Sequence, residues 1–176
     1  DRRNPRLPRR GGDRVGLTAG VRHGLTALRG ALGFLSRLPV GGDERAWEAF
    51  RATPAALPIA GYVVGALLAA VFVLPLSAPV AALVFAVWVY AVTGINHVDG
   101  LADLGDALVV HGPPEERRAA MKDAAVGVGA VLAVALCVAG LALAGLALAA
   151  LSPRAVGIVL AAEVSAKLGM ASIVCL

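Results

Sequence analysis

Charged residues are scarce in this chain of 176 residues, in which Asp, Glu, Lys and Arg make up only 16% of the sequence. A soluble domain is about a quarter charged, so this sequence cannot supply the polar shell that a soluble protein needs. Hydrophobic residues make up 59% of the chain, and they are concentrated in long runs. The two observations argue against an ordinary soluble domain and indicate a membrane protein.

Cysteine is also nearly absent. The two cysteines, Cys137 and Cys175, both lie inside apolar runs. In that setting they resemble small hydrophobic side chains rather than a disulfide or a metal-binding pair. The sequence therefore predicts neither a disulfide framework nor a cysteine-based metal site.

Four apolar runs can each supply the roughly 20 residues that a membrane-spanning helix needs. They cover approximately residues 58–76, 80–95, 124–151 and 155–176, and their Ala, Gly and Val content suits close helix packing in lipid. The predicted fold is therefore an all-α, polytopic bundle of membrane helices. Because the chain stops inside an apolar run, we expect it to be truncated at the C-terminus.

The N-terminal region is basic. Residues 1–14, rich in arginine, proline and glycine, are predicted to form a disordered basic arm, which leaves residues 15–176 as the membrane domain. Residues 15–38 alternate apolar and basic side chains at spacings of three and four, which predicts an amphipathic helix at the membrane interface, ended by Pro39. Because the arm lacks aromatics and adjoins membrane segments, we expect it to set topology rather than to bind nucleic acid.

The distribution of basic residues also predicts the orientation. Eleven of the 16 Lys and Arg residues precede residue 52, so the N-terminus is expected in the cytoplasm. Two spans would then return the chain to the cytoplasm at residues 96–123. Arg154, which follows the third apolar run, is the one exception. We expect a multi-pass protein of the cytoplasmic membrane whose loop 96–123 faces the cytoplasm.

That loop carries Asp99, Asp103 and Asp106 at positions i, i+4 and i+7, within a narrow arc of one helix face. Three neighbouring carboxylates repel one another, and at a membrane boundary their charge is costly unless it is compensated. A hard divalent cation would compensate it, and Mg²⁺ takes carboxylate oxygens together with substrate phosphates. The alternative is an acidic stripe solvated by water. Small residues between the aspartates would let a ligand approach the backbone: Gly100, Ala102 and Gly105.

Basic residues follow the break at Pro113-Pro114. A helix is predicted from Glu115, where the helix dipole favours acidic residues. Arg118 and Lys122 share one face of it at i, i+4, so they could clamp a phosphate that the metal holds from the aspartate side. Arg117 either joins this clamp or anchors the loop to lipid headgroups.

Three further polar residues have two interpretations each. His97 points away from the aspartate face if the segment is helical, so it is either a catalytic base or a hydrogen-bonding anchor. Glu163 and Lys167 stand at i, i+4 in the last apolar run. They either form an intramembrane ion pair or extend the polar cavity from a neighbouring helix.

These motifs together resemble the cobalamin synthase family, the adenosylcobinamide-GDP ribazoletransferases of the late vitamin B12 pathway. The resemblance covers about residues 30–176. Two departures from the family pattern are Ala107, where the family usually has glycine, and Ala124-Ala125, where a basic residue is usual. The matching residues are Gly94, His97, Asp99-Gly100-Leu101-Ala102-Asp103, Asp106, Met121-Lys122-Asp123, Gly127 and Gly129, with Phe34 to Val40 and Pro58 to Gly61 upstream.

The resemblance implies an Mg²⁺-dependent phosphotransferase. Its donor would be adenosylcobinamide-GDP, its acceptor α-ribazole or its 5′-phosphate, and its products adenosylcobalamin or the 5′-phosphate of adenosylcobalamin together with GMP. The enzyme would work in contact with membrane lipid, and it could form a homo-oligomer. Residues expected in the site are metal ligands Asp99, Asp103, Asp106 and Asp123, catalytic Asp103, Asp106, Lys122 and His97, and phosphate-binding Arg117, Arg118 and Lys122.

Two alternatives are weaker. A CDP-alcohol phosphotransferase also uses an aspartate cluster at the membrane surface, but its aspartates are spaced more widely than Asp99, Asp103 and Asp106. A cation transporter would carry acidic residues deep in several spans, whereas only Glu163 is deep here.

Overall fold

The computed structural model describes residues 12–175, so most of the predicted basic arm lies outside the described residues. The described part is helical and contains no strand, which confirms the all-α prediction. Its elements are α1 (Gly12–Leu35), α2 (Glu44–Arg51), α3 (Ala56–Ala69) continued by the 3-10 helix η1 (Ala70–Val73), α4 (Ala78–Thr93), α5 (Asn96–Val109), α6 (Pro114–Ala120), α7 (Val128–Ala150) and α8 (Arg154–Val174).

Among residues 12–175, three helical stretches are long and apolar enough to cross a membrane. They are Ala56–Val73, Val128–Ala150 and Arg154–Val174, with mean hydropathies of 2.3, 2.7 and 1.6. The helix α4 has 16 residues and qualifies only together with α5, from which it is bent by 99°. The four predicted apolar helices are therefore present. Three qualify as spans, or four if the bent pair counts as one.

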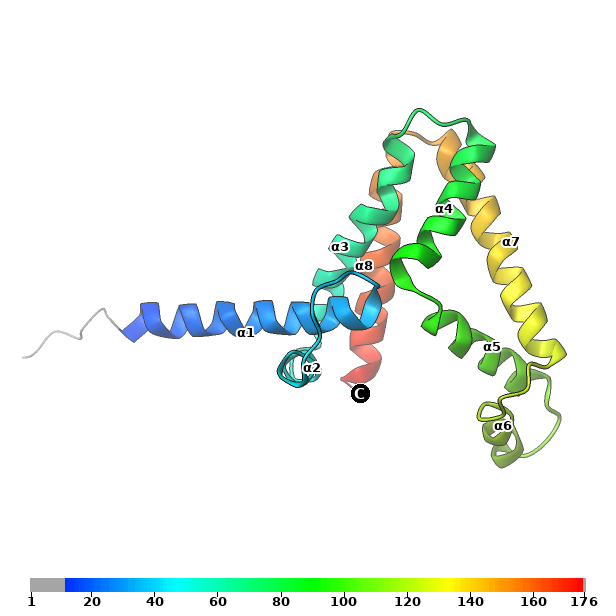
Figure 1. Ribbon diagram of the computed structural model, residues 1–176, viewed down its shortest axis with the longest axis horizontal. Coiled ribbons are helices and arrows are strands. Elements are labelled where there is room, and N and C mark those ends of the chain that lie inside the picture. The colour runs from blue at the N-terminus through cyan, green and yellow to red at the C-terminus, as the bar shows by residue number, and fades with distance from the viewer. Residues whose placement is uncertain (1–11, 176) are drawn as a thin grey trace, which may run out of the picture.

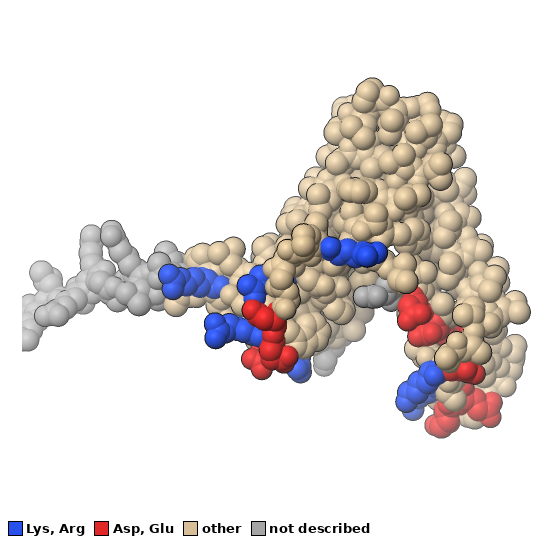
Figure 2. Space-filling model, in the orientation of Figure 1, with Lys and Arg blue, Asp and Glu red and all other residues tan. Residues whose placement is uncertain are grey.

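The apolar helices form two antiparallel pairs (Figure 1). The helix α3 packs along α8, α4 packs along α7, and α5 crosses the start of α7. The turns at 74–77 and 151–153 lie at one end, whereas α1, α2, α5 and α6 lie at the other. On the face shown in Figure 2, the charged side chains gather at this second end. That separation is typical of a protein with one strongly charged membrane surface.

The core lies where α1, α3 and α8 meet. Its largest fully buried side chains are Leu35, Val64 and Leu68. A Cβ on Gly61 would lie 3.1 Å from Val164 Cα, and one on Gly65 would lie 3.1 Å from Glu163 Cβ. Two glycines one helical turn apart thus let the backbones of α3 and α8 approach closely, a common packing device in membrane helices.

The ion pair predicted in the last apolar run is present. Lys167 Nζ donates to Glu163 Oε2 at 2.7 Å, and both side chains are largely buried. Pairing within one helix limits the cost of burying two charges in an apolar bundle. Cys137 and Cys175 are both free thiols in the described structure.

The first helix differs from its predicted bounds. It begins at Gly12, three residues before the predicted start, and ends at Leu35 rather than at Pro39. Ser36 Oγ donates to the Leu32 carbonyl at 2.6 Å, and it also accepts the Leu38 N–H at 3.4 Å. Such local side-chain bonds compete with the helix ladder, and the residue before a proline disfavours helical geometry. Both effects end α1 early.

The short helix α2 has no counterpart among the predicted elements. Asp43 caps it by accepting the Ala46 N–H at 2.7 Å, and it also pairs with Arg29 of α1. The hydrogen bond from Ala46, followed by that from Arg29, lowers the pKa of the Asp43 carboxyl below its usual value. This contact therefore supports the α1–α2 packing at neutral pH and is lost as the pH falls through the lowered pKa.

Candidate active site

The three aspartates of α5 lie on one face of that helix, as predicted from their spacing. They line a cavity of about 260 Å³, together with Lys122 and Asp123 from the segment that leads into α7. We call this space the carboxylate cavity. The segment that follows α6 and contains Lys122 and Asp123 thus folds back over the aspartates of α5. Two segments about 20 residues apart in the sequence form one site.

Asp106 has a role that the sequence did not reveal. Its Oδ2 accepts the Gly127 N–H at 2.8 Å, and its Oδ1 accepts the Ala130 N–H at 2.8 Å. Gly127 is the N-cap residue of α7 and offers no side-chain cap, and Ala130 lies in the first turn of that helix. A carboxylate at a helix N-terminus satisfies free N–H groups and interacts favourably with the helix dipole. Asp106 therefore fastens α7 to α5.

Glycines bring the two helices into contact at this point. A Cβ on Gly105 would lie 2.5 Å from the Gly129 carbonyl oxygen, and a Cβ on Gly127 would collide with the Asp106 carboxylate. The interpretation of Gly105 as room for a ligand is therefore wrong, because the backbone of α7 fills that space. Gly100, by contrast, has open space where a side chain would be.

The remaining carboxylates of the cavity are less engaged. Asp123 Oδ1 accepts the Ala125 N–H at 3.0 Å. Among the side chains that the structure describes, Asp99 and Asp103 take part in no hydrogen bond or ion pair, and neither does Lys122. Asp99 and Lys122 are exposed, and Asp103 is half-buried. The cavity thus presents carboxylate oxygens and one ammonium group to a ligand.

This donor set suits a hard divalent cation. No group of three acidic or histidine side chains closes around a single point among the described residues. Mg²⁺ does not require such a cage, since it commonly binds one or two carboxylates and completes its shell with water and substrate phosphates. Asp99 and Asp103, one helical turn apart and without a side-chain partner among the described residues, fit that pattern.

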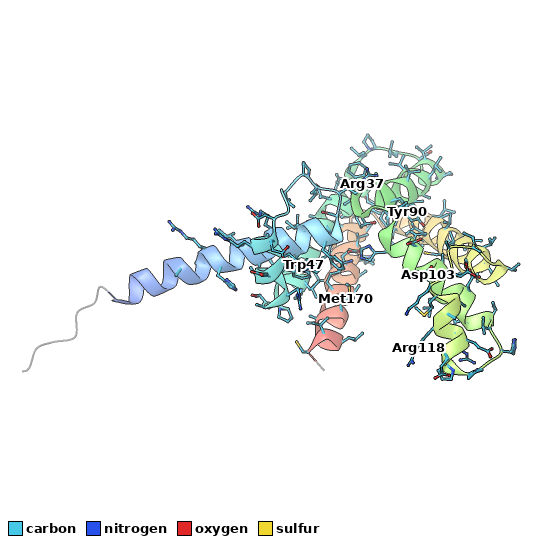
Figure 3. All side chains as sticks on the ribbon, turned by 60° about the horizontal axis from the view of Figure 1, so that its bottom comes forward. Arg37, Trp47, Tyr90, Asp103, Arg118 and Met170 are labelled. Atoms are coloured by element: carbon cyan, nitrogen blue, oxygen red, sulfur yellow. The ribbon has the colours of Figure 1, made fainter. Side chains whose placement is uncertain are left out.

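Three predicted site residues lie outside the carboxylate cavity. Arg117 and Arg118 are exposed on α6, next to α5, and do not line the cavity. Figure 3 shows Arg118 and Asp103 on these neighbouring helices. The His97 ring meets Phe34 of α1 edge-on, with ring centroids 6.1 Å apart. This position agrees with the expectation that His97 points away from the aspartate face.

Comparisons with known proteins identify the family to which the sequence is similar. The sequence profile of a family described as cobalamin-5-phosphate synthase matches residues 27–176. An adenosylcobinamide-GDP ribazoletransferase of Halorubrum lacusprofundi is 53% identical over 160 residues, covering 86% of this chain and 62% of that relative. The protein of the same name from Haloquadratum walsbyi is 46% identical over 157 residues, with the same coverage of 86% and 62%.

A more distant relative of the same name, from Methanocella arvoryzae, is 38% identical over 115 residues, covering 64% of this chain and 43% of the relative. The chain thus spans 62% of the length of the first two relatives. No solved structure matches.

Proposed function

Because the chain belongs to the cobalamin-5-phosphate synthase family, we propose that it is a transferase of late cobalamin biosynthesis that joins adenosylcobinamide-GDP to α-ribazole or its 5′-phosphate. The proposal takes the activity from the names of the relatives. The observation that carries it to this chain is the carboxylate cavity, in which the aspartates of α5 and Lys122 face one space.

The proposed reaction exchanges one bond at phosphorus. A ribose hydroxyl oxygen of the acceptor attacks the phosphorus that is linked to cobinamide. The bond from that phosphorus to the oxygen bridging to GMP breaks, GMP leaves with that oxygen, and the hydroxyl proton passes to a base. Phosphoryl chemistry of this kind asks a protein mainly for positioning and for neutralisation of charge.

The residues of the cavity divide these tasks. Asp99 and Asp103 would hold Mg²⁺, with Asp123 on the facing segment as a further ligand. When bound, the ion neutralises the pyrophosphate and the charge that develops on the leaving GMP. The Lys122 ammonium adds positive charge from the opposite wall, as in other sites that bind phosphate. Asp106 keeps that wall in place, because it holds the first turn of α7.

We place the cavity at the cytoplasmic surface of the cytoplasmic membrane. The charged end of the molecule carries α1, α2, α5 and α6 (Figures 1 and 2), and positively charged segments stay on the cytoplasmic side. The side chains of α7 are mostly exposed in the described structure, so this helix offers an apolar surface to membrane lipid. Nucleotide substrates would reach the cavity from the cytoplasm.

The test is a transfer assay with the full-length protein in lipid vesicles. With Mg²⁺ and adenosylcobinamide-GDP, we expect GMP release that depends on added α-ribazole or its 5′-phosphate, with a cobalamin product detected by mass spectrometry. A folded protein that releases no GMP with either acceptor would contradict the proposal. A parallel incubation with a CDP-alcohol and a lipid acceptor is expected to release no CMP, and release of CMP would favour the phospholipid-synthesising alternative.

A further inference from the structure

Arg37 lies at a structurally constrained position between two helices. It follows the end of α1, and its backbone N–H donates to the Val92 carbonyl, in the last turn of α4, at 2.7 Å. Gly94, which ends α4, has a φ of +77°, and a Cβ there would lie 3.2 Å from Arg37 Cγ. A glycine is thus required at the α4–α5 bend, both for its backbone geometry and to let the Arg37 side chain lie across it.

A second, smaller cavity of about 170 Å³ lies at this bend, and Ser36, Arg37, Thr93 and Ile95 are among its lining residues. We call it the Arg37 pocket. Ser36 Oγ and Thr93 Oγ1 donate to backbone carbonyls at 2.6 and 2.8 Å, so their protons are already used. The ion pairs among the described side chains are Arg29–Asp43 and Lys167–Glu163, and neither includes Arg37. The guanidinium is therefore the cation that this pocket offers to a ligand.

The Arg37 pocket lies at the start of α5, and the carboxylate cavity lies farther along the same helix. Ile95, which lines the pocket, is the N-cap residue of α5, and it precedes Asp99 by four residues and Asp103 by eight. At a rise of about 1.5 Å per residue, the two aspartates lie about 6 and 12 Å beyond Ile95 along the helix axis. Figure 3 shows Arg37 beside the end of α4 and Asp103 on α5. One ligand can thus reach both sites.

We propose that Arg37 binds the 5′-phosphate of the acceptor and thereby selects phosphorylated over free α-ribazole, an inference that rests on the proposed function. The reaction involves two kinds of phosphate. The donor pyrophosphate reacts and belongs at the carboxylate cavity, where a metal neutralises it. The acceptor's own phosphate does not react, and unneutralised carboxylates would repel it. It therefore needs a separate cation nearby, and an arginine fork matches a phosphate group well.

The dimensions agree with this assignment. The 5′-phosphate of a ribose and the hydroxyls of the same ring are a few bonds apart, which is comparable to the helical turn of about 5.4 Å that separates Ile95, at the pocket, from Asp99. With its phosphate on Arg37, the acceptor would place a ring hydroxyl toward Asp99, where the donor phosphorus is expected. The name of the matched family, cobalamin-5-phosphate synthase, describes a product that keeps such a phosphate.

The test compares the two acceptors in Arg37→Ala, using the full-length protein in lipid vesicles. We expect the KM for α-ribazole 5′-phosphate to rise roughly 10- to 100-fold, as for loss of a hydrogen-bonded charged contact, with a much smaller change in kcat. The KM for unphosphorylated α-ribazole should not change. Arg37→Lys should fall between the two, because lysine keeps the charge but loses the planar fork.

Arg45→Ala is the matched control. Arg45 is an exposed arginine of α2 at the same end of the molecule, and it lines neither cavity. We expect wild-type constants for both acceptors in this variant. If Arg37→Ala weakens both acceptors equally, Arg37 is only structural, and if it changes neither, the pocket does not bind the phosphate. Either result overturns the proposal.

A binding titration separates this inference from the proposed function. Calorimetry with α-ribazole 5′-phosphate alone, without donor, should show binding to the wild type that is at least tenfold weaker in Arg37→Ala. Such a result supports the phosphate site even if no transfer is observed, whereas equal binding in both proteins contradicts it. If Arg37→Ala does not fold, Arg37→Gln serves in its place, since it keeps the side-chain stem across Gly94 and removes the charge.

Discussion

Two of the glycine-lined helix crossings, α3–α8 and α5–α7, differ in how their charges are balanced. At the α3–α8 crossing, Gly61 and Gly65 admit the backbone of α8, and the nearby Glu163 pairs with Lys167 of its own helix. At the α5–α7 crossing, Gly105 meets Gly129, but Asp99 and Asp103 beside it have no ion-pair partner among the described residues. The packing device is the same, and only the second crossing leaves negative charge for a ligand.

The aspartates of the second crossing also differ among themselves. Asp106 is bound by two backbone N–H groups of α7, whereas Asp103, one turn before it, lines the cavity without such partners. Identical side chains on one helix face therefore have different tasks. One maintains the crossing, and the others are available for metal and substrate.

The largest expected effect separates Asp103 from Asp106. Asp103→Asn should reduce GMP release by about 10³-fold, the order expected when a charge that stabilises the transition state is removed, and leave the thermal stability in detergent unchanged. Asp106→Ala should instead lower the free energy of unfolding by about 1–3 kcal/mol, because two amides of α7 lose their acceptor. Near-normal turnover in Asp103→Asn would refute its role as a metal ligand.

The next largest effect is a loss of stability on replacing glycines, which should differ between the two crossings. Gly129→Ala should destabilise the protein by about 1–3 kcal/mol, because the added methyl group meets backbone atoms of Gly105 that cannot move aside freely. Gly61→Ala should cost less, since its Cβ would lie 3.1 Å from the nearest atom of α8. Thermal unfolding of both variants in the same detergent measures the difference. An equal loss, or a larger one in Gly61→Ala, would contradict the geometry.

The sequence predicted the shared face of the aspartates but not the contact of Asp106 with α7. The 3.6-residue period was enough to place Asp99, Asp103 and Asp106 on one helix face. The partners of Asp106 lie 21 and 24 residues away, and no local pattern shows that α7 would begin against it. One signal was available: the apolar run after Gly127 starts without a capping residue of its own, so the first amides of α7 needed an acceptor from elsewhere.

The bend between α4 and α5 could not be predicted from the sequence either. Gly94 marks the end of a helix, but the 99° change of direction goes with the packing of α7 against both α4 and α5, which no local pattern shows. The helix α2 was missed because eight residues are too few for a clear period, although Asp43 before Glu44 is a typical start signal. The positions of Arg117 and Arg118 likewise depend on how α6 packs.

The smallest expected effect concerns the α3–α8 crossing, where Glu163 is paired with Lys167. Glu163→Gln leaves Lys167 without its partner and should destabilise the protein by about 1 kcal/mol, because a lysine can extend its ammonium group toward water. Combining it with Lys167→Met should restore most of the loss in thermal unfolding. Both variants should keep wild-type turnover. A loss of turnover without unfolding would show that this pair belongs to the site after all.

Binding of a divalent ion tests the central claim most directly. Mn²⁺, used as a spectroscopic substitute for Mg²⁺, can be titrated into the wild type, into Asp99→Asn/Asp103→Asn and into Gly61→Ala as a control, with free Mn²⁺ measured by electron paramagnetic resonance. We predict that the wild type and the control bind the ion and that the double variant binds it at least tenfold more weakly while remaining folded. Equal affinity in all three proteins would contradict the assignment of the carboxylate cavity as a metal site.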